Sequence, residues 1–340
     1  MSAPTAPIPV VALSPEPAGG DARRTTGLLL GVLSALAFSS SGPVVKPLLE
    51  AGWSLGAALL VRMGLAALLL APALILAFRR ERRFLRRHGR LIVLFGLTAV
   101  AGCQLLFFSA MQRMPVAVAL LIQYLAPVLL VIYAWVRTRR PPSRLVIAGS
   151  VVAMAGLVLV VDIAGARFDL LGTILALGAA VCAGAYFLVS EQTGAGLPPL
   201  ALASGGLFVG TALIGILILA GVLPFAAPDV EVVLAGVEVP GLLAILWVAC
   251  AATTLGYAFG VMAVPRIGSR VASFVGLSEV LFALGFAWLL LAETPAPVQF
   301  AGGALILVGV VLVRMDASGS PAPSAAVAAA ETTTPPPRAP

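Results

Sequence analysis

Glu279 is the residue of this sequence that most directly suggests chemistry, because it lies deep inside an apolar stretch. It falls about nine residues, or roughly 13 Å, into a run long enough to cross a membrane. A carboxylate at that depth costs roughly 2.5–3.5 kcal/mol on insertion scales, which favours protonation or a cationic partner. Glu279 is therefore a candidate proton-coupling group or an anchor for a substrate amine. The alternative is a structural carboxylate that is hydrogen-bonded to Ser278, Ser273 or a neighbouring helix.

Neutral polar side chains occur at similar depths in other apolar runs. A zwitterion or a polar metabolite could be held by such groups in a cavity that is closed to lipid. For each of them alone, hydrogen bonding between helices is the alternative explanation. The candidate substrate-binding residues of this kind are Gln104, Gln123, Tyr124, Tyr186 and Tyr257.

Arg62 is a further candidate substrate-binding residue, about seven residues into the second apolar run and near its outer side. Its long stem could carry the guanidinium to the lipid headgroups, as arginines near helix ends often do. If it faces inward, it would instead attract a substrate carboxylate near the external gate. Both interpretations stay open at the level of sequence.

Other kinds of site are absent from the sequence. No metalloprotease motif, phosphate-binding glycine loop with Lys or Ser/His arrangement is present, so no catalytic residue is assigned and the chain is not read as an enzyme. Cys103, Cys182 and Cys250 lack metal-site spacing, and no metal or cofactor is expected. His88 lies in a basic loop and is expected to be solvated.

The overall composition is that of a membrane protein. Of 340 residues, 61% are hydrophobic and 10% are charged, with a mean hydropathy of +1.09. Soluble domains average about 25% charged residues. A membrane-crossing helix needs about 20 apolar residues. Ten runs meet this condition: 27–48, 55–78, 90–112, 115–136, 144–162, 171–190, 200–222, 240–263, 270–292 and 297–314.

Two of these runs resemble each other at a shift of 153 positions. The segments Arg113–Trp135 and Arg266–Trp288 both begin with Arg and end with Trp. Five of their 23 aligned positions are identical. One copy carries Gln123 and Tyr124 near its middle, and the other carries Glu279. Corresponding halves that are each interrupted at mid-depth indicate the binding site of a transporter.

The ten runs divide into two halves of five. Because five is odd, a second half that resembles the first must be inserted upside down, which is the inverted-repeat plan. We therefore expect an all-α integral membrane fold of ten transmembrane helices in two inverted five-helix repeats, 27–162 and 171–314. The Pro- and Ala-rich arm 1–26 and the tail 315–340 are predicted to be disordered. No conformation is predicted for the loop 222–240.

Basic residues predict the orientation. Seven of the 21 Lys and Arg residues lie between Arg79 and Arg90, in a loop between two apolar runs. With the N-terminus inside, 17 of the 21 fall in the tails or in the even-numbered loops. Because cytoplasmic loops are enriched in Lys and Arg, we expect a multi-pass protein of the plasma (inner) membrane with both termini cytoplasmic. The same location argues against nucleic-acid binding.

Several stretches together resemble a known family. They are the small-residue first helix ending in Lys46, the LLVRMGLAALLL run with Arg62, the LIQYLAPVLLVIYAW run, and SEVLFALGFAWLLLAET ending in Glu293. Taken together they are similar to the ten-helix drug/metabolite transporters with two EamA-type domains, over about 27–314. The first half departs from the closing pattern, because no acid follows Trp135.

This resemblance implies a secondary-active transporter that exports small metabolites, most often amino acids or related compounds, by alternating access. Proton coupling through Glu279 is a hypothesis. Helices 1–4 and 6–9 are expected around a central cavity, with helices 5 and 10 peripheral. The expected partners are membrane lipid and a small-molecule substrate, and a homodimer is left open. The alternatives are a multidrug or other metabolite carrier, including one for uptake, a channel, or a membrane enzyme.

Overall fold

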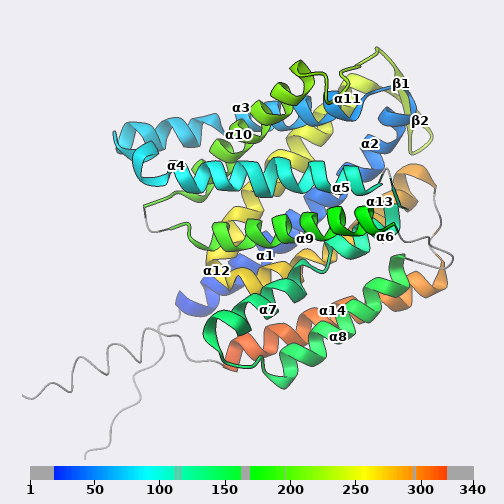
Figure 1. Cartoon of the computed structure of the whole chain (residues 1–340). Helices are drawn as coiled ribbons and strands as arrows, with labels where there is room; N and C mark the ends of the chain where they lie inside the picture. Colours follow the sequence, from blue (N-terminus) through cyan, green and yellow to red (C-terminus); the bar gives the residue numbers. More distant parts are fainter. Residues whose placement is uncertain are drawn as a thin grey trace, which may run out of the picture.

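The structure, a computed structural model, describes residues 19–111, 113–114, 116–161, 169–194, 196–292, 294 and 296–319. The described chain is a bundle of helices with a small hairpin at one end (Figure 1). The helices of its first half are α1 (Gly19–Ser39), α2 (Ser41–Glu50), α3 (Leu55–Arg80), α4 (Phe84–Phe95), the π-helix η1 (Gly96–Gly102), α5 (Cys103–Met111), α6 (Val116–Gln123), α7 (Ala126–Thr138) and α8 (Arg144–Val161).

The second half begins with α9 and contains the hairpin. Its elements are α9 (Leu170–Glu191), α10 (Pro199–Leu219), the strands β1 (Glu231–Leu234) and β2 (Val237–Pro240), α11 (Gly241–Trp247), the π-helix η2 (Val248–Leu255), α12 (Gly256–Gly276), α13 (Ser278–Leu291) and α14 (Pro297–Gly319). Each predicted apolar run lies mainly on helix, so the all-helical expectation is confirmed.

Eight helical stretches of the described chain are long and apolar enough to cross a membrane, and Arg144–Val160 and Ser278–Leu291 are shorter apolar helices. One of the eight, Gly241–Gly276, combines the eighth predicted run with the start of the ninth. It is interrupted at Gly268, where φ is 80° and ψ is 155°. Glycine adopts this backbone conformation readily, and helical residues do not.

The two halves repeat local features at the same shift of 153 positions. The π-helix η1 at 96–102 falls on η2 at 248–255 within one residue. The helices α7 and α13 both end on a non-glycine residue in the left-handed conformation, Arg139 and Ala292, each with φ 55°. Such residues are uncommon. Their recurrence at equivalent positions supports the repeat that the sequence indicates.

The ends of the bundle are more ordered than predicted. The helix α1 begins at Gly19 and α14 continues to Gly319, so 19–26 and 315–319 are helical instead of disordered. Arg24 donates a hydrogen bond to the Arg314 carbonyl at 3.2 Å, and Arg270 lies 3.8 Å from the Asp316 carboxylate. These contacts hold in place two segments whose composition alone predicted disorder. Residues 1–18 and 320–340 lie outside the described chain.

His88 is buried, with 6% of its surface exposed, so the prediction of a solvated histidine is wrong. Helix α4 begins before the apolar run does. Phe84, His88 and Ile92 lie four residues apart, on one face, and this face packs into the protein. The ring of His88 lies 5.1 Å from that of Phe84.

Residues 231–240 of the loop 222–240 form an antiparallel hairpin with the Ala235–Gly236 turn at its tip. Both turn residues have positive φ, at 52° and 77°, as a tight two-residue hairpin requires. The Ala235 N–H donates to the Leu290 carbonyl at 2.8 Å, which ties the hairpin to the end of α13.

The main helix pairs each join a helix of the first half to a helix of the second half. Helix α3 packs on α10, and α8 packs on α14 along one edge of the bundle (Figure 1). Helix α1 packs on α12 and α13 of the second half, whereas α9 packs on α5 and α6 of the first half. Many large apolar side chains face outward, including Leu219 at 90% exposure. In a membrane such faces contact lipid.

Gly206 and Gly210 bring α10 into close contact with its neighbours. A Cβ atom at Gly206 would lie 2.4 Å from the Phe95 ring, and one at Gly210 would lie 2.7 Å from the Met63 Cε. The two glycines let α10 approach η1 and α3 closely, as small residues do in membrane helix pairs.

Candidate functional site

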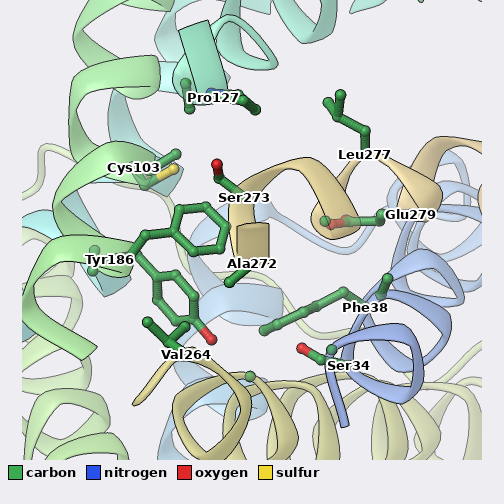
Figure 2. A pocket seen from close by; sticks show the side chains of 18 of the residues that line it. Ser34, Phe38, Cys103, Pro127, Tyr186, Val264, Ala272, Ser273, Leu277 and Glu279 are labelled. Atoms are coloured by element: carbon green, nitrogen blue, oxygen red, sulfur yellow. The ribbon is translucent and has the colours of Figure 1, made fainter. Parts of the chain in front are cut away.

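A cavity of about 180 Å³ lies among helices from both halves of the chain. Its lining residues come from α1, η1, α5, α9, α12 and α13 and from the region where α6 meets α7 (Figure 2). Helices α3, α8, α10 and α14 contribute none of the described lining residues. The cavity is therefore built from the first, third, fourth, sixth, eighth and ninth apolar runs. The expectation that the second and seventh runs also line it is wrong for this cavity.

Six of the seven predicted site residues line this single cavity. Their common feature is a polar group at mid-depth in an apolar run, which is the property that selected them from the sequence. They are Gln104, Gln123, Tyr124, Tyr186, Tyr257 and Glu279, and Arg62 is not among the lining residues.

Glu279 lies in the first turn of α13, and its carboxylate points into the cavity (Figure 2). Tyr124, from the link between α6 and α7, is its hydrogen-bonding partner. The two serines considered as partners bond elsewhere: Ser278 donates to the Val275 carbonyl at 2.6 Å, and Ser273 donates to the Arg270 carbonyl at 2.8 Å. The Glu279–Tyr124 contact thus joins the interruptions of the two corresponding runs.

The amide nitrogen of Gln123 has a hydrogen-bond partner, and its amide oxygen has none among the described residues. Its Nε2 donates to the Cys103 Sγ at 3.6 Å, and that thiol donates to the Ala179 carbonyl of α9 at 3.6 Å. The buried Oε1 of Gln123 has no hydrogen-bond partner among the described residues. A buried carbonyl oxygen without a donor is a ready acceptor for a ligand.

Tyr257 is the most enclosed of the site tyrosines, at 5% exposure. Its hydroxyl donates to the Ala99 carbonyl of η1 at 3.4 Å, so the wider turn of the π-helix supplies its partner. Its ring packs edge-on against Phe38 at 5.1 Å and lies 6.0 Å from the Tyr186 ring. Tyr257 therefore forms part of the cavity wall, and its hydroxyl proton is already donated to the Ala99 carbonyl.

Arg62 is buried beside the cavity, at 7% exposure, so the snorkelling interpretation is wrong. Its Nη1 donates to the Ser41 Oγ at 3.2 Å, where α2 begins after the break at Ser40. Its Nε has no hydrogen-bond partner among the described residues. Arg62 interacts electrostatically with Tyr257 and Glu279, so its charge influences the cavity although Arg62 does not line it.

Several lining residues escaped the sequence analysis because they look like ordinary helix residues. Cys103 and Ser34 are of this kind: each is one small side chain in an apolar run. Ser34 donates to the Gly256 carbonyl at 2.8 Å. Gly260 gave no signal at all, although a Cβ atom there would lie 1.9 Å from the Tyr186 hydroxyl oxygen. Only the spatial meeting of α9 and α12 reveals its role.

The lining combines one carboxylate with neutral acceptors and hydroxyls, and it contains no cationic side chain among the described residues. Such a site can hold an amine or a proton at the carboxylate and polar groups elsewhere. Together with apolar helices that face outward, this interior site defines the class of the protein: a multi-pass membrane protein with a small polar cavity in its core.

The chain belongs to the EamA-like transporter family, whose model matches residues 25–162 and 170–315. The two matched segments are two EamA repeats, and the resemblance seen in the sequence is confirmed. The family points to a transporter and not to an enzyme.

Two curated relatives are named as exporters. A protein of Streptantibioticus cattleyicolor named "Probable terminal-alkyne amino-acid exporter" is 29% identical over 290 residues, which is 85% of this chain and 93% of that protein. The threonine/homoserine exporter RhtA of Escherichia coli K12 is 29% identical over 249 residues, 72% of this chain and 79% of that protein. A solved crystal structure with 18% identity shares the fold, with a TM-score of 0.63 over 89% of this chain and 99% of its own.

Proposed function

We propose that this protein is a secondary-active exporter of small amino acids that works by alternating access. The observation that carries the proposal is the cavity, whose lining places the Glu279 carboxylate among neutral polar groups in a chain of the EamA family. Both curated relatives described above are named as amino-acid exporters, which supports the substrate class.

Size supports a small substrate over a drug-sized one. Pockets for drug-sized ligands measure roughly 300–1,000 Å³, whereas this cavity measures about 180 Å³. A compact amino acid suits the smaller volume. The multidrug alternative would require a considerable expansion of the cavity.

The proposed architecture is ten membrane crossings in two inverted five-helix repeats. Supporting it, η1 and η2 recur at equivalent positions, and α7 and α13 end in the same way. The reciprocal packing of α1 and α9 on the opposite halves also fits a pseudo-twofold relation. In such carriers the substrate site lies at the interface of the repeats, near mid-membrane.

The proposed location is the plasma membrane, with both termini in the cytoplasm. The concentration of arginines between Arg79 and Arg90 supports this orientation. It places the segment 220–240, which contains the hairpin 231–240, on the outer side.

In this proposal Glu279 is the group that binds a proton or the substrate ammonium. Tyr124 orients its carboxylate, and Gln123 Oε1 offers a second acceptor nearby. Arg62 acts from outside the lining. Its buried charge stabilises the ionised carboxylate when the site holds neither a proton nor an ammonium.

An export assay tests the function. Cells that overexpress the protein should release more L-threonine or L-homoserine into the medium than cells with the empty vector. They should also grow at higher concentrations of both in the medium, because export lowers the internal concentration. A full metabolite comparison of the two supernatants covers the other small amino acids. Equal supernatants for all of these amino acids, with the protein correctly inserted, would contradict the proposal.

A further inference from the structure

The hydroxyl of Tyr186 is a buried polar group that makes no hydrogen bond to the described residues. Its oxygen is buried and has no hydrogen-bond partner among the described residues. Tyr186 lines the cavity, and its hydroxyl end lies between α9 and α12, against Gly260 (Figure 2). A buried hydroxyl that lacks a partner destabilises the fold, so its presence calls for an explanation.

Neighbouring hydroxyls are already committed. Ser34 donates to the Gly256 carbonyl at 2.8 Å, and Tyr257 donates to the Ala99 carbonyl at 3.4 Å. Tyr186 is therefore the tyrosine on this side of the cavity whose proton is still available. Its ring is held in place by aromatic contacts, at 5.6 Å from Phe95 and 5.0 Å from Phe187.

Gly260 determines where this hydroxyl lies. A Cβ atom at Gly260 would lie 1.9 Å from the Tyr186 oxygen and 2.8 Å from the Ser34 Oγ. No side chain fits there while Tyr186 keeps its position. The glycine thus leaves a notch in α12, and the hydroxyl of Tyr186 occupies it.

The remaining lining shows what this donor is for. Glu279 and the Gln123 Oε1 are acceptors, and they come from α13 and α6. They suit the ammonium end of an amino acid. The carboxylate end needs a donor, and the lining offers no cationic side chain among the described residues. A tyrosine hydroxyl on the α9–α12 side meets this need.

We propose that the Tyr186 hydroxyl donates a hydrogen bond to the substrate carboxylate, and that Gly260 is the positioning residue that holds it there. The proposal rests on the proposed function and narrows it to zwitterionic substrates, which bind between Glu279 and Tyr186. A substrate with an amine and no carboxylate makes no use of Tyr186.

Purified protein in proteoliposomes tests this with two probes. L-Threonine carries both charged ends, and 1-amino-2-propanol keeps its amine and hydroxyl but lacks the carboxylate. Tyr186→Phe should raise the KM for L-threonine by about tenfold to a hundredfold, the usual effect of losing a hydrogen bond to a charged group. The inhibition constant of 1-amino-2-propanol should stay within about twofold.

The same variant separates binding from a structural role. Because Tyr186→Phe removes an unsatisfied hydroxyl, its thermal unfolding temperature should equal or exceed that of the wild type. A KM for L-threonine that does not change, or an equal weakening for both probes, would overturn the proposal. A wild type that transports neither L-threonine nor L-homoserine would instead contradict the proposed function, before any variant is compared.

Gly260→Ala provides an independent variant, with Gly285→Ala as its matched control. An added Cβ at Gly285 meets nothing within 4 Å, so that variant should transport normally. Gly260→Ala should raise the KM for L-threonine as Tyr186→Phe does. When it is added to Tyr186→Phe, its further effect should be under about threefold, because the closest oxygen, 1.9 Å from the added Cβ atom, is gone and only the milder 2.8 Å approach to the Ser34 Oγ remains. Fully additive effects of the two substitutions would contradict the coupling.

Discussion

At the scale of residues, the site depends on a contact between two helix interruptions. Tyr124 lies between α6 and α7, and Glu279 is the second residue of α13, which begins at Ser278 after the break at Leu277. Their hydrogen bond joins the halves at the cavity. A proton or a substrate ammonium that binds Glu279 competes with this bond and with the charge of Arg62. The occupancy of one carboxylate can therefore influence how the two halves pack.

Glu279→Gln tests the proton role directly. The amide keeps the size of the side chain and fixes it neutral, so the variant should insert and fold normally. Transport driven by a pH gradient should fall at least tenfold and lose its dependence on pH. Substrate exchange should continue with a raised KM, because the amide oxygen still accepts a hydrogen bond from the substrate ammonium, but more weakly than a carboxylate does. Both are measured in proteoliposomes with and without an imposed gradient.

The exposed Glu50 at the end of α2 provides a matched control, and Glu50→Gln should leave gradient-driven transport unchanged. If Glu279→Gln instead abolishes both exchange and gradient-driven flux, Glu279 anchors the substrate amine. Normal folding with unchanged, pH-dependent transport would rule out both roles.

The polar site residues could be found from sequence, because an amide, a phenol or a carboxylate at mid-depth in an apolar run is costly in lipid and needs an explanation. Gly260 could not be found in this way. Its importance lies in what it lacks, and this becomes visible only when Tyr186 packs against it. The side-chain direction of Arg62 was equally hidden, since its helix position fits both burial and snorkelling.

At the scale of elements, the α8–α14 pair is held by glycines that face each other's backbone. A Cβ atom at Gly302 would lie 2.6 Å from the Gly156 carbonyl oxygen, and one at Gly309 would lie 2.6 Å from the Gly149 carbonyl oxygen. Backbone atoms cannot move aside as side-chain ends can. This pair contributes nothing to the described lining of the cavity, so its role is structural.

Gly302→Ala should therefore destabilise the protein, and Gly303→Ala is its matched control. The neighbouring Gly303 would bring its Cβ atom only against the flexible end of Leu281, at 2.9 Å. Overpacking of a tight site costs about 1–3 kcal/mol. The expected result is a clearly lower thermal unfolding temperature in detergent for Gly302→Ala than for Gly303→Ala. Equal unfolding temperatures would show that the close approach does not stabilise the pair.

Apolar runs predicted the helices, but their internal irregularities could not be predicted. The π-helices η1 and η2 lie in sequences that read as ordinary apolar helix. The kink at Gly268 could not be distinguished from the many helical glycines of the chain. These features depend on neighbouring helices, as the Tyr257 hydroxyl bond to η1 illustrates.

At the scale of the whole molecule, the proposed orientation makes a direct prediction. Reporter fusions after Arg90 and Arg144 should behave as cytoplasmic, and those after Asp169 and Asp229 as external. Alkaline phosphatase and green fluorescent protein fusions measure the two cases. An external reporter in the segment 80–90 would overturn the orientation.

The helical, multi-pass character and the two EamA repeats were accessible from sequence, because a membrane imposes strong constraints on the length and composition of its helices. The hairpin 231–240 and the ordered ends of α1 and α14 were not accessible. They lie outside the apolar runs, where contacts such as Ala235 N–H to the Leu290 carbonyl and Arg270 to Asp316 decide the structure.

The central claim is that the cavity belongs to a carrier of small amino acids. Counterflow in proteoliposomes tests this claim most directly. Vesicles loaded with unlabelled L-threonine or L-homoserine and diluted into labelled substrate should accumulate label transiently above its equilibrium level, with a rate that saturates as the substrate concentration rises. Label that only equilibrates, at a rate linear in concentration, or that enters no faster than in protein-free vesicles, would contradict the claim.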